Sequence, residues 1–346
     1  MYSRFARAFI MREMPNYLIA FVTGDCNMNC RFCCNAAQDM RKRNELSPAQ
    51  WANALKDSRA LLHLTVTGGE PFMRDDLDEL IIAIAESSGV PDISINTNGF
   101  LSSKIYETVE KILLALPNIT LTIAVSLDGP LEIHDRLRNK KGSAVAAYKT
   151  ISSLSMLKDD FPNLKTRLQS IVVPENAGKL DKFIHETNAW PLDFHEIIFP
   201  RDCNNKNGYK QSLVDSYRKL AAKQVINYKL TKTSTLKTKI FRLLYKNILR
   251  NLDEGYYCAP CPAGGRLIEI FSDGTVVGCE MSKVKGKSEF GTVGSTENTL
   301  ADLCKTPKAE QFRREIAANC SCTFECAQIC NIVFNAKNWI ELVKPN

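Results

Sequence analysis

The sequence lacks any apolar run approaching the roughly 18–20 residues that span a bilayer, although 45% of its 346 residues are hydrophobic. Its start carries Arg4, Arg7 and Arg12, but it has no apolar core followed by a small-residue cleavage site, so it does not resemble a signal peptide. We interpret it as a short amphipathic lead-in. These absences argue against a membrane-spanning or secreted protein and make the cytoplasm the expected location.

The sequence also lacks internal repeats, low-complexity tracts, arginine-rich blocks and any known nucleic-acid motif. Its net charge of +7 is concentrated in residues 201–257, where 13 Lys and Arg stand against 4 Asp and Glu. We interpret this excess as the solvated face of basic helices. A surface for an anionic partner is the alternative. Nucleic acid is therefore not an expected partner.

Cysteine is almost absent from the middle of the chain. Of 13 cysteines, four lie in residues 26–34 and eight in 258–330, and only Cys203 lies between these groups. Thiols stay reduced in the cytosol, so clustered cysteines there more often bind metal or carry out redox chemistry than form disulfides. The distribution predicts two metal or redox sites.

Six short runs rich in β-branched and apolar residues are each followed by a helical pattern. They cover residues 17–23, 61–68, 92–99, 121–129, 167–173 and 194–199. Alternating strands and helices predict an α/β fold with a parallel sheet and right-handed crossovers. Six units rather than eight predict a partial (β/α)6 TIM-like barrel, open on one side. Ligands of such folds gather at the carboxyl ends of the strands, where the unusual polar residues fall.

The first cysteine group has the spacing C-x3-C-x2-C at Cys26, Cys30 and Cys33. Three thiolates from one loop can hold three irons of a [4Fe–4S] cluster, which leaves the fourth iron open for another ligand. Zinc is the alternative, and it needs a fourth Cys or His nearby. Cys34 is adjacent, but vicinal cysteines chelate one ion awkwardly, so we interpret it as a bystander.

The segment "CNMNCRFC" resembles the signature of radical S-adenosylmethionine (radical SAM) enzymes, with Phe32 at the aromatic position. "TGGEP" (67–71), "NTNG" (96–99) and "SLDGPLEIHDRLRNKKGS" (126–143) resemble later motifs of that family, in the same order. The resemblance implies that S-adenosylmethionine occupies the open iron. It also implies a set of cofactor-binding residues: Gly68, Gly69, Glu70, Asn98, Ser126 and Arg138. Gly68 and Gly69 are expected to let the backbone approach the methionine end closely, and Asn98 and Asp128 alternatively hold loop geometry.

The resemblance further implies the reaction. A reductant such as flavodoxin or ferredoxin supplies an electron, S-adenosylmethionine is cleaved, and a 5′-deoxyadenosyl radical removes hydrogen from a substrate. No residue is assigned a catalytic role, His134 included. The substrate is expected to be a peptide or protein, or a small metabolite. Only about 17 residues precede the first strand, so no fused leader-peptide-binding domain is expected, although a separate protein could present a peptide.

The second cysteine group surrounds an expected hairpin, "RLIEIFSDGTVVGCE", whose turn is Asp273-Gly274. The hairpin with its later "CSCTFEC" resembles the SPASM or twitch auxiliary domain of radical SAM enzymes. That resemblance implies one auxiliary [4Fe–4S] cluster that relays an electron. Its four ligands are expected among five residues: Cys261, Cys279, Cys320, Cys322 and Cys326. Structural zinc is again the alternative. Three others are expected to be ordinary thiols: Cys258, Cys304 and Cys330.

These expectations divide the chain into four parts: a lead-in (1–16), the radical SAM barrel (17–200), a basic helical linker (201–257) and the auxiliary domain (258–346). Two other function classes stay open. A non-catalytic iron–sulfur electron carrier would use both cysteine groups but not "TGGEP". A zinc-stabilised protein that binds nucleic acid through its basic helices would hold zinc instead of iron.

Overall fold

The structure is a computed structural model that describes Ala8, Ile10 and residues 14–33, 44–201, 211–230, 236–254, 260–281, 288–294, 297–320 and 322–343. Three of the cysteines discussed above, Cys34, Cys203 and Cys258, lie outside the described residues, as does most of the lead-in.

Six parallel strands form the predicted sheet. They are β1 (Tyr17–Thr23), β2 (His63–Gly68), β3 (Asp92–Thr97), β4 (Thr120–Ser126), β5 (Leu164–Ile171) and β6 (Phe194–Ile198). They pair in sequence order, which confirms the expected partial barrel. Strand β5 begins at Leu164, ahead of the predicted start at 167. Lys165 pairs there with Thr122 of β4, and its side chain alternates outward from buried neighbours.

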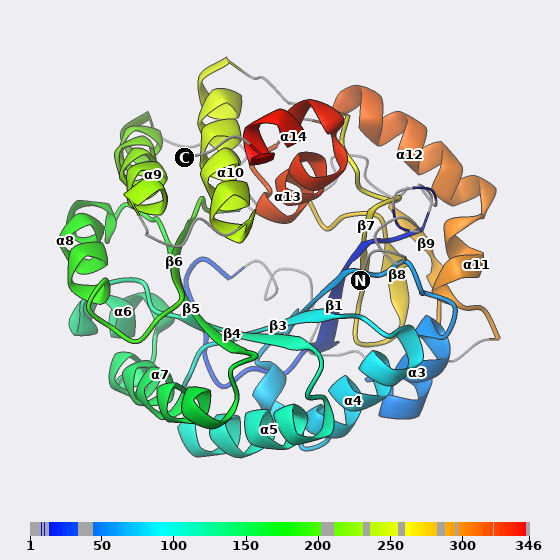
Figure 1. Cartoon of the computed structure of the whole chain (residues 1–346), viewed down its shortest axis with the longest axis horizontal. Helices are drawn as coiled ribbons and strands as arrows, with labels where there is room; N and C mark the ends of the chain where they lie inside the picture. The colour runs from blue at the N-terminus through cyan, green and yellow to red at the C-terminus, as the bar shows by residue number, and fades with distance from the viewer. Residues whose placement is uncertain are drawn as a thin grey trace.

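Helices cover the outer face of the sheet. They are α3 (Pro48–Leu55), α4 (Leu77–Ser88), α5 (Ser102–Ala115), α7 (Ser143–Asp160) and α8 (Ala177–Thr187). The short helix α6 (Leu131–Arg138) and a 3-10 turn η2 (Pro71–Met73) instead follow the carboxyl ends of β4 and β2. Helix α3 shows how local sequence sets a boundary: Ser47 and Gln50 form a capping box around Pro48. Figure 1 shows α3, α4, α5 and α7 on one side of the strands.

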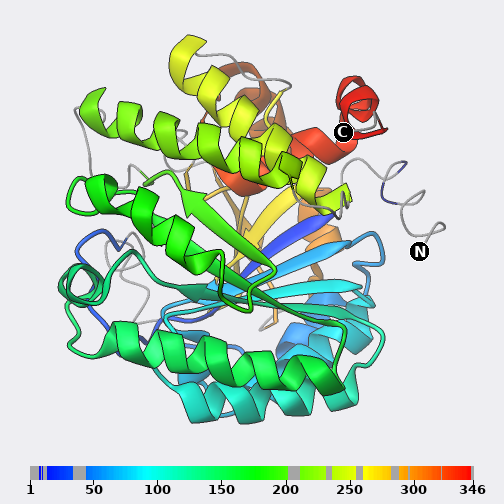
Figure 2. The same ribbon diagram turned by 60° about the vertical axis from the view of Figure 1, so that its left-hand side comes forward.

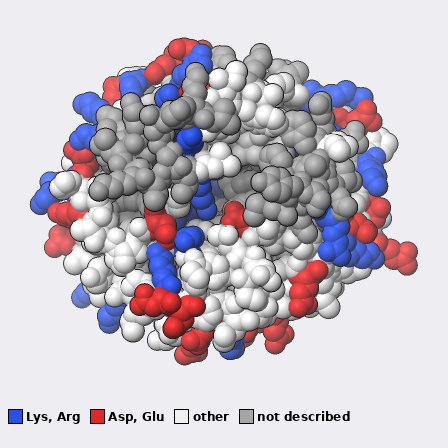
Figure 3. All heavy atoms as spheres, in the orientation of Figure 1, with Lys and Arg blue, Asp and Glu red and all other residues white. Residues whose placement is uncertain are grey.

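The basic segment forms two helices on the other side of the sheet, α9 (Gln211–Leu230) and α10 (Leu236–Glu254). Figure 2 shows them opposite α5 and α7. Part of their positive charge is paired, because Arg218 contacts Asp215 and Asp253, and Lys223 contacts Asp181 of α8. Positive and negative side chains are interspersed over the described part of the face in Figure 3. No described helix combines the length and hydropathy that crossing a bilayer requires.

The expected hairpin is present and continues the barrel sheet. Strand β7 (Leu267–Ile270) pairs in parallel with β1, and β8 (Thr275–Val277) and β9 (Glu289–Thr292) add antiparallel strands beyond it. Gly274 closes the turn with a φ of 85°, a conformation that favours glycine. The rest of the cysteine-rich tail is largely helical: α11 (Leu300–Cys304), α12 (Pro307–Asn319), α13 (Glu325–Phe334) and α14 (Ala336–Val343).

Candidate radical SAM site

A cavity of about 230 Å3 lies at the carboxyl ends of the barrel strands. Every residue predicted for the first cluster and its cofactor lines it: Cys26, Cys30, Cys33, Gly68, Gly69, Glu70, Asn98, Ser126 and Arg138. The ends of β5 and β6 supply further lining that sequence reasoning missed: Gln169, Ile171, Ile198 and Arg201. No motif marks these residues. Their position at or just past strand ends is the only signal that could have found them.

The two glycines hold the cysteine loop against the end of β2. The amide of Gly69 donates to the carbonyl of Thr23 at 2.8 Å, and the amide of Glu70 donates to that of Asp25 at 2.7 Å. A Cβ on Gly69 would lie 2.0 Å from the Asp25 carbonyl oxygen, and one on Gly68 would lie 2.3 Å from that of Thr23. Glycine is therefore required at both positions because the loop of residues 23–25 packs directly against them.

Glu70 joins three segments beneath the cavity. Its buried carboxylate accepts hydrogen bonds from the hydroxyl of Thr97 at 2.7 Å and from the amides of Asn98 at 2.6 Å and Phe72 at 3.3 Å. Burial outweighs these bonds and raises the pKa of Glu70 to about 7. Asn98 then donates to the Asn27 side chain at 2.7 Å. This network fixes the ends of β2 and β3 relative to the cysteine loop, which supports the loop-holding alternative for Asn98.

Arg138 lies between a buried carboxylate and the cysteines. Its Nε donates to Asp128 at 2.7 Å, its Nη1 lies 3.9 Å from the Cys30 sulfur, and its guanidinium stacks 5.1 Å from the Phe32 ring centroid. Burial alone would raise the pKa of Asp128, but Arg138 and His134 outweigh it and hold that pKa well below its usual range. His134 accepts from the amide of Asp128 at 3.0 Å, which is a structural contact.

The thiols fit an iron–sulfur cluster. Burial raises the pKa of Cys26 and Cys30, and Arg138 opposes the rise at Cys30. A metal ion bound to these thiols would favour the thiolate and oppose this rise. Among the described residues, no three His, Cys, Asp or Glu side chains converge on one ion position. Thiolates that each bind a different iron of a cube do not need to converge in this way.

In the second cysteine group, Cys322 is linked to both Cys320 and Cys279. A hydrogen bond that the Cys322 thiol makes to Cys320, then burial, raises the pKa of Cys322, and Cys322 is in turn a charge neighbour of Cys279. Cys326 instead accepts a hydrogen bond from the hydroxyl of Tyr17 at 3.4 Å. Cys261 is also buried, and it precedes the first strand of the hairpin in the sequence. Two of the expected ordinary thiols, Cys304 and Cys330, are also buried.

Comparison with known proteins places both cysteine groups in established families. A model described as the radical SAM superfamily matches residues 21–185, and one described as an iron–sulfur cluster-binding domain, SPASM, matches residues 261–327. The chain is 35% identical over 153 residues to Fe-coproporphyrin III synthase of Methanosarcina barkeri, a match covering 40% of this chain and 36% of that protein. It is 24% identical over 297 residues to GTP 3′,8-cyclase of Clostridium botulinum, covering 84% and 89%.

The fold is shared with SuiB of Streptococcus suis. The structure of SuiB bound to its precursor peptide SuiA superposes with a TM-score of 0.62 at 16% identity, covering 90% of this chain and 69% of that one. The two family models match in this order, the first over the partial barrel and the second over the hairpin and the tail. The chain therefore belongs to the radical SAM superfamily and carries a C-terminal SPASM domain, with [4Fe–4S] clusters and S-adenosylmethionine as its cofactors.

Proposed function

We propose that Cys26, Cys30 and Cys33 hold the cluster that binds S-adenosylmethionine, and that the barrel (17–200) and the auxiliary domain (258–346) together oxidise one C–H position of a substrate. The observation that carries this proposal is the single cavity that all the residues predicted for this site line. The cofactor, when bound and reduced by a flavodoxin- or ferredoxin-type donor, supplies a 5′-deoxyadenosyl radical that abstracts hydrogen.

The residues of the chain have distinct tasks in this proposal. Arg138, held by Asp128, presents a positive charge beside Cys30 that suits the carboxylate of the cofactor. Ser126 lines the same cavity and offers a hydroxyl. Buried Glu70 keeps the glycine segment and the loop in register.

Charge within the cavity favours a substrate of low charge. Of the two arginines that line it, Arg138 is assigned to the carboxylate of the cofactor, and Arg201 pairs with Glu280. A nucleoside triphosphate needs unpaired cations at its phosphates, and the described lining supplies none. We therefore propose a peptide or protein segment as the substrate. The fold shared with SuiB, which binds a precursor peptide, is compatible with this choice.

Contacts within the auxiliary domain support a ligand set. We propose that Cys261 and Cys279 act with Cys320 and Cys322, because Cys322 contacts Cys320 and is a charge neighbour of Cys279. Cys261 is included because the SPASM resemblance implies it. A closed set of four thiolates leaves no iron for substrate. A cluster held by these cysteines would supply an acceptor for the electron that remains after hydrogen abstraction, and the net reaction would then be an oxidation.

The test uses anaerobically reconstituted protein with dithionite and S-adenosylmethionine, and 5′-deoxyadenosine is measured by chromatography. We expect the wild-type protein to form it and Cys30→Ala to lose it. Cys304→Ala is the matched control, because Cys304 is a buried thiol outside both ligand sets. Absence of 5′-deoxyadenosine from the wild type, or its formation by Cys30→Ala, contradicts the proposal and favours a non-catalytic electron carrier.

Substrate class and electron transfer are tested separately. Supplying GTP and candidate peptides in parallel should raise 5′-deoxyadenosine formation above the uncoupled rate only with a peptide. Cys279→Ala should keep the uncoupled cleavage and lose the modified product. Stimulation by GTP alone contradicts the peptide proposal, and full turnover by Cys279→Ala contradicts the auxiliary role.

A further inference from the structure

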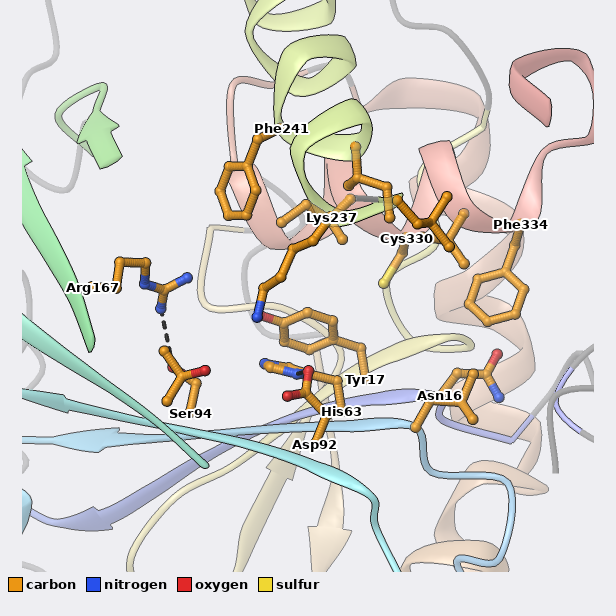
Figure 4. Close-up of a pocket in the computed structure, with 16 residues that line it drawn as sticks. Asn16, Tyr17, His63, Asp92, Ser94, Arg167, Lys237, Phe241, Cys330 and Phe334 are labelled. Carbon is orange, nitrogen blue, oxygen red and sulfur yellow. Dashed lines mark hydrogen bonds and ion pairs between the residues drawn. The ribbon is translucent and has the colours of Figure 1, made fainter. Parts of the chain in front are cut away.

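A second cavity, of about 370 Å3, lies inside the partial barrel at the opposite end from the cysteine loop. The first residues of three neighbouring strands line it: Tyr17 of β1, His63 of β2 and Asp92 of β3. None of the residues that line the radical SAM cavity lines this one. It is therefore a separate site, and nothing in the proposed reaction uses it. Figure 4 shows its side chains.

The cavity has two chemically different walls. One wall is apolar and comes from α10 and α13: Leu236, Ile240, Phe241, Ile329, Val333 and Phe334. The other is the polar inner face of the sheet, with Ser94 and Thr122 beside the strand-start residues. A ligand that satisfies both walls has an apolar body and a polar end.

Two cations face the polar end, and both have unused donors. Within the described part of the chain, Lys237 has no hydrogen-bond or ion-pair partner, and its ammonium lies 5.6 Å from the ring centroid of Phe194. Figure 4 shows it reaching from α10 towards Tyr17 and His63. Arg167 donates to Ser94 at 3.0 Å and lies 3.4 Å from a carboxylate oxygen of Glu196. Its buried Nε has no partner.

The charges at the polar end leave Lys237 as the open cation. Asp92 is the only carboxylate among the described lining residues, and its Oδ2 is held by His63 Nδ1 at 2.6 Å. Glu196 does not line the cavity but pairs with Arg167, so these two carboxylates balance the two cations when His63 is neutral. Burial also lowers the pKa of Lys237, partly offset by Asp92, which shows that its charged form is poorly solvated. A bound carboxylate would relieve this cost.

We propose that this cavity binds a small amphipathic carboxylate, with its carboxylate at Lys237 and Arg167 and its apolar body against α10 and α13. The volume lies within the range of about 300–1,000 Å3 that is usual for small-molecule sites. The buried hydroxyl of Thr122, which has no partner, offers a further donor to the carboxylate. Asp92 Oδ1 is likewise unpartnered and directs the anion away from its own side.

The test is calorimetric titration of the full-length reconstituted protein with octanoate, and with octanamide as its uncharged counterpart. We expect octanoate to bind at least tenfold more tightly than octanamide. Lys237→Met should weaken octanoate binding at least tenfold. Lys246→Met, the same change at an exposed position of α10, should leave it unaltered.

A second variant locates the ligand without altering charge. Val333→Phe places a larger side chain in the cavity, and we expect it to abolish octanoate binding while 5′-deoxyadenosine formation persists. Equal binding of octanoate and octanamide to the wild type overturns the proposal, and so does no binding at millimolar octanoate. Octanoate binding that survives both Lys237→Met and Val333→Phe places the ligand elsewhere and also overturns it.

Discussion

Replacing Asp128 by asparagine tests the reasoning behind the radical SAM cavity most directly. Asp128 is fully buried, and its two oxygens accept from Arg138 Nε at 2.7 Å and from the amide of Ile171 at 3.0 Å. The Asp128→Asn change keeps the shape of the side chain but removes its charge. Arg138, whose side chain is only 12% exposed, then loses its carboxylate partner.

Removing one partner of a buried ion pair costs about 3–5 kcal/mol, because the other charge stays buried without compensation. We expect a loss of this size in the free energy of unfolding for Asp128→Asn and for Arg138→Met. The double variant should lose less than the sum, by about 2 kcal/mol, because it leaves neither charge stranded. Arg138 released from Asp128 should also bind S-adenosylmethionine about tenfold more weakly, a change of about 1.4 kcal/mol.

The assay is urea unfolding of the apoprotein under anaerobic conditions at neutral pH, combined with calorimetric binding of S-adenosylmethionine to reconstituted protein. Asp75→Asn is the matched control, because Asp75 pairs with Lys104 in solvent and should contribute little. Additive losses in the double variant would refute the claim that Asp128 and Arg138 act as one buried pair. Unchanged cofactor affinity in Asp128→Asn would refute the positioning of Arg138.

Three further predictions test other parts of the site. Gly69→Ala should prevent assembly of the first cluster, measured by iron content, because the added Cβ meets the cysteine loop. Gly178→Ala is the control: it adds a methyl group to open space in α8 and should leave the iron content unchanged. Because its pKa is raised to about 7, Glu70 stays protonated in the folded apoprotein at pH values where it has already ionised in the unfolded chain. The free energy of unfolding should therefore fall as the pH rises from 5 to 7, and Glu70→Gln should flatten that slope in urea titrations. Tyr17→Phe should leave the auxiliary-cluster potential unchanged in an electron paramagnetic resonance redox titration, because the hydroxyl of Tyr17 donates to Cys326, which is outside the proposed ligand set. A more negative potential would show that Cys326 is a ligand, because loss of a hydrogen bond to a ligand sulfur lowers the potential.

The sequence predicted the elements whose signals are local. Strand β1 was expected and found over the same residues, because an unbroken apolar run marks a strand that is buried on both faces. The cysteine loop and "TGGEP" were recognisable because their residues are adjacent in the chain. Glu70 was expected at the strand end, but the hydrogen bonds that give it a structural role come from Thr97, which ends the next strand, and from Asn98, which follows it.

The features that the sequence did not reveal depend on distant contacts. Nothing in Leu267–Ile270 indicates that it pairs with β1 instead of forming a separate small sheet. Arg167 and Lys237 are ordinary basic residues of a strand and a helix in the sequence, and only the closure of α10 over the sheet brings them to one cavity. The packing of Gly69 against Asp25 is likewise a contact between two separate segments, and the sequence gives no sign of it.

Continuity between β1 and β7 gives the auxiliary domain a fixed relation to the radical SAM cavity. Arg201 follows β6, lines that cavity and pairs with Glu280, the residue after Cys279. Its guanidinium also stacks 4.6 Å from the ring of Phe324, which lies between Cys322 and Cys326. One side chain at the cavity wall therefore contacts both segments that carry the proposed auxiliary ligands. A substrate held against this wall would lie between the two cysteine groups, which is the placement that the proposed electron transfer to the second cluster requires.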